Sequence, residues 1–238
     1  MGTSAKKLAA VLCVCAVLLS LCACSQEEER EEPANVRWLR NVSETFGVNS
    51  YVIQIMTTET GSPGTVRRWS GTYDGRNAYI KSEDSEGASE LCYVRDGEGC
   101  KVYIWNAEYE IWLSQDVTAD DNMFYAYEVI DRMNKYGSWM DQELIEYDEE
   151  TQTYHGCDLP GKCVIDGEEH LITDLYIKTD GQYIRSVKER YIIETDDGTA
   201  HTRTDELTVS SVGKASITMP EKVWIEQELR DEYGDLFS

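Results

Sequence analysis

The sequence predicts an α+β fold in which an antiparallel β-meander makes up most of the chain. The first observation is a series of short runs rich in β-branched and aromatic residues. The second is that Asp-Gly dipeptides, which favour tight hairpin turns, separate these runs at residues 74–75, 96–97, 166–167, 180–181 and 197–198. The third is that two stretches with helical spacing interrupt the pattern, one before the first strand and one in the middle.

The first helix is expected from Pro33 to near Gly47. Proline is favoured in the first turn of a helix, and Val36, Leu39 and Phe46 recur with roughly helical spacing. Strands are then expected at about 50–59, 65–73, 77–82, 89–95, 100–105 and 109–114. Together they form the first half of the meander.

A second helix is expected after Asp120 or Asp121, either of which can cap it. Its apolar residues lie mainly on one face: Phe124, Tyr127, Val129, Ile130 and Met133. Strands resume at about 142–147, 151–157, 162–167, 169–178, 182–195, 200–210 and 214–219. The acidic piece 221–238 is expected to be a short helix packing on the domain or a frayed tail.

The N-terminus has the order of a secretory signal: Lys6 and Lys7, then an uncharged apolar run from 8 to 21. The sequence Leu21-Cys22-Ala23-Cys24 closes this run and resembles the lipobox of bacterial lipoproteins. The resemblance implies cleavage before Cys24 and acylation of its thiol. The alternative is an uncleaved signal anchor, because the uncharged stretch approaches the roughly 20 residues that span a bilayer.

Both alternatives place the rest of the chain outside the cytoplasmic membrane, since the two lysines stay inside. The expected organisation is a signal peptide at 1–23, an acidic tether at 24–33, a sheet domain at 34–220 and an acidic tail at 221–238. Two acyl chains would hold the protein stably at the membrane, where one holds it only marginally. The expected location is the extracytoplasmic face of the cell membrane, with a lipid anchor.

The charge of the chain excludes one class of partner. Residues 1–23 contain two of the 22 basic residues and none of the 45 acidic ones, so the remainder has a formal charge of −25. Such a surface repels nucleic acid and anionic headgroups. We therefore expect no nucleic-acid partner, and membrane association only through the acyl chains.

Four cysteines follow the lipid site: Cys92, Cys100, Cys157 and Cys163. In an oxidising compartment four thiols most economically form two disulfides, and three pairings are possible. Cys92 and Cys100 flank one Asp-Gly turn, and Cys157 and Cys163 flank a Pro-Gly turn. The two local pairs are the favoured prediction.

The order of helix, meander, helix, meander and a final strand ending in Pro220 resembles lipoprotein carriers and lipoproteins of the LolA and LppX type. The matching stretches are Asn35 to Phe46 leading into residues 51–55, and residues 207–209 followed by 215–220. The resemblance implies a strongly curved open half-barrel whose helices cover the concave face and enclose an apolar cavity. In such a cavity, large aromatics would line the wall: Trp69, Tyr103, Trp105 and Trp112.

The apparent catalytic and metal motifs fail on context, so we expect no enzyme, cofactor or metal. Residues 156–162 have P-loop spacing, but Cys163 replaces the required Ser or Thr and the segment joins two strands. Residues 211–214 fit Ser-x-x-Lys without its companion motifs. The set of His155, Cys157, Cys163 and His170 lacks the spacing of a zinc module.

The leading hypothesis is therefore a membrane-tethered, non-enzymatic lipoprotein that binds a lipid or another apolar ligand in a half-barrel cavity. The alternative is an extracytoplasmic interaction or regulatory module, in which the protein's own side chains fill the sheet and a partner protein binds outside. The two differ in whether the concave space is open or filled.

Overall fold

The computed structural model describes residues 32–47, 50–60, 66–85, 87–96, 99–117, 124–160, 162–165, 168–194 and 198–225, together with Glu228. The predicted signal peptide, Cys24 and most of the acidic tether lie outside the described residues. Ala34 to Ser238 belong to one compact unit. No helix in the described ranges is both long and apolar enough to cross a bilayer.

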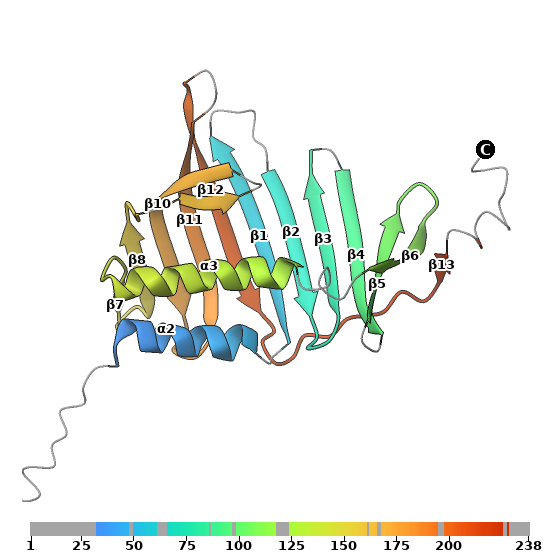
Figure 1. Cartoon of the computed structure of the whole chain (residues 1–238), viewed down its shortest axis with the longest axis horizontal. Coiled ribbons are helices and arrows are strands. Elements are labelled where there is room, and N and C mark those ends of the chain that lie inside the picture. The colour runs from blue at the N-terminus through green and yellow to red at the C-terminus, as the bar shows by residue number, and fades with distance from the viewer. Residues whose placement is uncertain are drawn as a thin grey trace, which may run out of the picture. The chain divides into compact units, whose positions relative to one another are not determined.

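The described part of the chain builds one sheet of thirteen strands (Figure 1). The strands are β1 (Tyr51–Thr60), β2 (Val66–Tyr73), β3 (Ala78–Asp84), β4 (Gly87–Asp96), β5 (Gly99–Asn106), β6 (Ile111–Val117), β7 (Glu146–Asp148), β8 (Thr153–Cys157), β9 (Lys162–Ile165), β10 (Glu168–Thr179), β11 (Ile184–Glu194), β12 (Ala200–Ser210) and β13 (Val223–Ile225). Their order is β13-β6-β5-β4-β3-β2-β1-β12-β11-β10-β8-β7, with β9 also paired to β10. Among the strand pairs of the described residues, only β13 with β6 is parallel.

The Asp-Gly turns explain much of this meander. Gly75 and Gly181 have φ values of 91° and 90°, which glycine adopts without the steric cost that other residues meet. Asp74 accepts hydrogen bonds from the backbone N–H groups of Arg76 and Asn77, and so fixes the β2–β3 turn. Such side-chain bonds to the following backbone are why aspartate is frequent in turns.

Two helical segments lie across one face of the sheet (Figure 1). The first is α2 (Ala34–Val42), which continues into a π-helical turn, η1 (Ser43–Gly47), and the second is α3 (Phe124–Asp141). They meet where the Trp38 indole N–H donates to the Met133 carbonyl over 2.8 Å. The predicted α+β fold, an open antiparallel meander with its helices on one face, is confirmed.

Strand alternation divides the side chains between two faces. We call the face that carries α2 and α3 the helix-side face and the opposite one the open face. Ile53 and Val209 are cross-strand partners in the core beneath the helices, and so mark the helix-side face. Their neighbours Gln54 and Thr208 point to the open face and are exposed.

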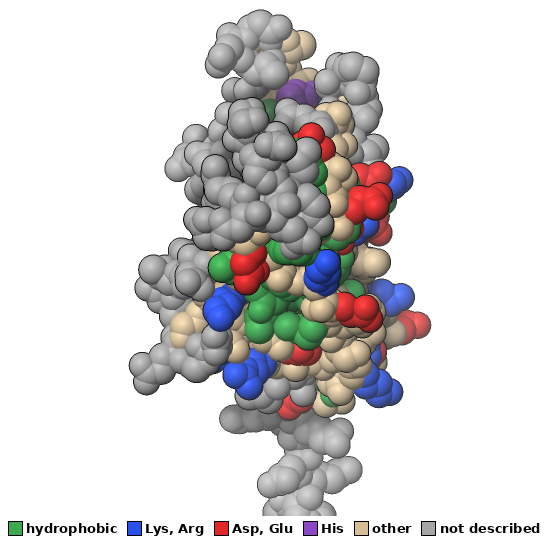
Figure 2. All heavy atoms as spheres, turned by 90° about the vertical axis from the view of Figure 1, so that its right-hand side faces the viewer, with side chains coloured by type: hydrophobic (Ala, Val, Ile, Leu, Met, Phe, Trp, Pro, Cys, Tyr) green, Lys and Arg blue, Asp and Glu red, His purple; other side chains and the backbone are tan. Residues whose placement is uncertain are grey.

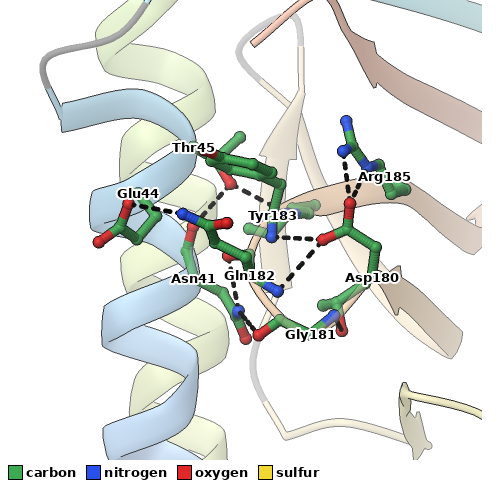
Figure 3. A network of polar contacts seen from close by, with 10 residues as sticks. Asn41, Glu44, Thr45, Asp180, Gly181, Gln182, Tyr183 and Arg185 are labelled. Carbon is green, nitrogen blue, oxygen red and sulfur yellow. Dashed lines mark hydrogen bonds and ion pairs between the residues drawn. The ribbon is translucent and has the colours of Figure 1, made fainter. Parts of the chain in front are cut away.

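A polar network fixes the end of α2 to the β10–β11 hairpin (Figure 3). The Asn41 amide donates to the carbonyls of Gly181 and Gln182, at 3.2 and 2.8 Å. The Thr45 hydroxyl donates to the Asn41 carbonyl at 2.6 Å and accepts the Ile184 N–H at 2.9 Å. Since Asn41 and Thr45 are fully buried, these bonds satisfy groups that water cannot reach.

Three predicted elements differ from the structure. The strand expected at 142–147 is only β7, because the N–H groups of Glu143 and Leu144 bond back to carbonyls of α3 and so close a turn before the strand. The strand expected at 214–219 forms no ladder; instead Gly213 donates to the Ser50 carbonyl and the chain runs on unpaired. The piece after residue 221 was expected to be a helix or a frayed tail, but it contributes β13.

Candidate binding surfaces

The space beneath the helices is filled by the protein's own side chains. Trp38 packs against Tyr154 and Tyr136, with ring centroids 5.3 and 6.1 Å away. These three residues, with Met133 and Tyr191, have no exposed surface. The core cluster joins both helices to β1, β8 and β10–β12. The apolar cavity expected between helices and sheet is therefore not found over these strands, because aromatic side chains fill that space.

A second apolar surface lies on the same face, over β3–β6. Ile80, Leu91, Ile104 and Leu113 are successive cross-strand partners, and Val102 lies beside them on β5. We call these five residues the apolar strip. Ile80 and Val102 are buried, while the other three are half-buried. No residue of β3–β6 belongs to the described core cluster. Ile80 and Val102 are each 5% exposed, so the strip is accessible at Leu91, Ile104 and Leu113, and all five residues lie outside the described core cluster.

The four aromatics predicted to line one cavity do not come together. Trp69 pairs with Ile55 and points to the helix-side face, where it packs against the core. Tyr103, Trp105 and Trp112 point to the open face, and the rings of Trp105 and Trp112 are 5.4 Å apart. The prediction of a shared cavity is wrong, because the register places Trp69 on the opposite side of the sheet.

The open face carries a groove of about 470 Å³ over β12, β1, β2 and β3. Most of its lining side chains point to this face by strand alternation, with Met56 at the centre and Arg68, Lys81, Glu83 and Glu206 around it. Met56 is 42% exposed. The groove is amphipathic, so it differs in character from the apolar strip behind it.

A smaller hollow of about 370 Å³ lies farther along the open face. Tyr79 and Trp112 line it together with residues 216–220, so the unpaired chain before β13 covers part of the open-face aromatics. Desolvation and a hydrogen bond to Glu90 raise the pKa of Tyr79 to about 12. Figure 2, seen from the side of β6 and β13, shows hydrophobic side chains gathered among charged ones.

The predicted pair of Cys92 and Cys100 does not form a disulfide. Cys92 faces Tyr103 across β4 and β5, whereas Cys100 faces Arg95, so the two thiols lie three positions apart and on opposite faces. Burial raises the pKa of Cys92 to about 11. Cys157 is also a thiol and is exposed, while the side chain of its predicted partner Cys163 lies outside the described residues.

A buried group of charges lies under α3. Glu189 is 2% exposed and its carboxylate contacts the Arg132 guanidinium at 3.3 Å and the Tyr191 hydroxyl. Asp205 on the next strand accepts from Thr57 at 2.8 Å and from Arg203 at 3.0 Å. Burial raises the pKa of Glu189 despite the nearby Arg132. These side chains bond to one another within the core, so we assign them a structural role.

No family model and no curated protein matches the chain. Among solved structures, it is similar to a LolA superfamily protein of Nitrosomonas europaea at 10% identity, over 79% of this chain and 96% of that one, with a TM-score of 0.29. An uncharacterized conserved protein of Thermus thermophilus matches at 10% identity over 80% and 98%, with a TM-score of 0.31. The Pseudomonas aeruginosa MucA/MucB complex matches at 10% identity over 83% and 60%, with a TM-score of 0.27.

Identities of 10% and TM-scores near 0.3 carry no argument about ligand, partner or catalysis.

Proposed function

We propose that this protein is a non-enzymatic binding domain, tethered outside the cell membrane by lipid on Cys24, that holds an acyl chain on the apolar strip. The observation that carries the proposal is the division of the helix-side face. One half is filled by aromatic core residues, and the other half, over β3–β6, presents aliphatic side chains outside that core.

The chemistry of the strip favours an acyl chain over an extended peptide. The backbone groups of β3, β4 and β5 are already paired with strands on both sides, so a peptide cannot add to the sheet there. A peptide lying on Leu91 and Ile104 would leave its own N–H and C=O groups without partners, which costs free energy. An acyl chain has no such groups and gains about 0.8 kcal/mol per buried methylene.

The membrane anchor supports the proposal from the sequence side. A tether of about ten residues after Cys24 keeps the domain close to the bilayer, the source of acyl chains. The strong negative charge keeps the surface itself away from anionic headgroups. The protein would then meet lipid through the strip rather than through a basic patch.

The test is Ile104→Thr, which puts a hydroxyl into the strip without disturbing strand preference. The domain from Glu32 to Ser238 is titrated with dansyl-labelled palmitate. We expect affinity to fall about tenfold, since losing a methyl contact and burying a hydroxyl cost about 1.4 kcal/mol. Tyr103→Thr is the matched control, because it changes the next residue of β5 on the open face. Equal losses in both variants, or no palmitate binding by the wild type, would contradict the proposal.

A separate observation favours the alternative, in which the domain binds a partner protein. The open face exposes Leu171 and Ile192, which are cross-strand partners, and also Tyr176 and Met56. Exposed apolar groups on one face are typical of interaction sites. A stoichiometric protein partner that crosslinks in cells and stays bound after lipid removal would favour this alternative.

A further inference from the structure

A group of three potential metal ligands lies on the open face beside the exposed Tyr176, and so on the face opposite the apolar strip. His155 and Cys157 are two residues apart on β8, so their side chains point to the same side. Asp174 on β10 is the direct cross-strand partner of Cys157. The antiparallel register therefore brings an imidazole, a thiol and a carboxylate together from two paired strands.

The ligand atoms already form a compact triangle. The His155 Nε2 atom is 3.1 Å from Asp174 Oδ1 and 3.3 Å from Cys157 Sγ, and Sγ is 3.8 Å from Oδ1. Usual zinc distances to N, O and S ligands in a tetrahedron imply separations of about 3.3–3.6 Å between such atoms. Shifts of a few tenths of an ångström would bring all three atoms into contact with one ion.

Neighbouring side chains hold two of these ligands in position. The Tyr176 ring stacks on the His155 imidazole with centroids 4.2 Å apart and planes at 21°. Arg190 approaches the other carboxylate oxygen of Asp174, Oδ2, at 3.7 Å, so Oδ1 stays directed at the histidine. Contacts of this kind orient metal ligands and are themselves important for affinity.

We propose that His155, Cys157 and Asp174 bind a single Zn²⁺ ion. A thiolate and an imidazole select zinc over magnesium or calcium, which prefer oxygen ligands alone. The side chains of His155 and Asp174 are 42% and 22% exposed, and Cys157 is exposed as well, so the ion can enter from solvent and water can fill the fourth position. The proposal is independent of acyl-chain binding, which concerns the opposite face.

The test uses Co²⁺ as a spectroscopic substitute for Zn²⁺ with the full chain, kept reduced by a phosphine. We expect one Co²⁺ per chain with a thiolate-to-cobalt charge-transfer band, displaced by one equivalent of Zn²⁺. The N-terminal cysteines are present in both the wild type and Cys157→Ser and can also bind Co²⁺. The contribution of the site is therefore measured as the difference in charge-transfer absorbance between these two proteins. His155→Ala and Asp174→Asn should each weaken binding by about tenfold or more.

Two control variants decide the assignment. His201→Gln changes a histidine that pairs with Glu59 on the helix-side face and should leave binding unchanged. Cys163→Ser should also retain the charge-transfer band. Loss of the band in Cys163→Ser together with full binding by Asp174→Asn would overturn the proposal in favour of a different ligand set. Identical spectra for wild type and Cys157→Ser would overturn it as well, and circular dichroism checks that each variant is folded.

Discussion

At the scale of single residues, register decides which side chains act together. Cys157 and Asp174 are 17 positions apart, and nothing in the spacing of the sequence connects them. The sequence suggested only a set of nearby cysteines and histidines, which was rejected as a zinc module on its spacing and did not include Asp174. The same effect separated Trp69 from Tyr103, because one residue of register moves a side chain to the other face. The sequence therefore indicates which residue types could bind a ligand, but only the strand pairing shows which of them lie together.

Glu189 provides a prediction at this scale. Burial raises its pKa above the ordinary value of 4.5, so the folded state holds its proton more tightly than the unfolded state. The stability contributed by this group is therefore complete below pH 4.5 and decreases as the pH rises toward the folded pKa. The free energy of unfolding of the wild type, measured with urea, should show this decrease between pH 4 and pH 7. In Glu189→Gln the same decrease should be smaller.

Glu90→Gln is the matched control for this experiment. Hydrogen bonds from Lys81 and Tyr79 lower the pKa of Glu90, so its contribution to stability grows with pH and the variant should lose stability at neutral pH instead. A pH profile of Glu189→Gln that is identical to the wild type would show that the buried carboxyl does not titrate as described.

At the scale of elements, hydrophobic periodicity and turn residues predicted most of the sheet. The long strands lie close to their predicted ranges, because Asp-Gly turns mark their ends and alternation marks their faces. Short elements were missed for a physical reason. β13 has three residues and pairs with β6, a distant part of the chain, which no local pattern reveals.

The joint between α2 and the β10–β11 hairpin gives the prediction at this scale. Thr45→Val removes the hydroxyl that accepts the Ile184 N–H and leaves that buried donor without its partner. The free energy of unfolding should fall by about 1–3 kcal/mol, measured by urea denaturation. Thr208→Val, at an exposed position on the open face, should change it by less than about 0.5 kcal/mol. Similar losses in both variants would mean that the joint does not stabilise the fold.

At the scale of the whole molecule, the fold and the expected anchor together support one proposal. The protein is a binding domain held beside the membrane that supplies its ligand. The fold class followed from the sequence, but the filled core did not, because composition cannot tell whether Trp38 and Tyr154 line a cavity or occupy it. Because the space beneath the helices is filled, we propose the ligand site on β3–β6 instead.

The anchor is tested by Cys24→Ala. If lipid on this cysteine tethers the chain, the variant should not incorporate labelled palmitate in growing cells, and the wild type should. Cys22→Ala removes a neighbouring thiol within the signal and serves as the control, which should still be labelled. Continued labelling of Cys24→Ala would defeat the assignment of the lipid site.

The central claim is that an acyl chain lies on the apolar strip, and photolabelling tests it most directly. The full chain is irradiated in membranes that contain a phospholipid with a diazirine in its acyl chain, and the modified peptides are mapped by mass spectrometry. The account predicts adducts on β3–β6, at or beside Leu91, Ile104 and Leu113. Adducts confined to the helices or to open-face residues, or an unlabelled domain, would contradict it.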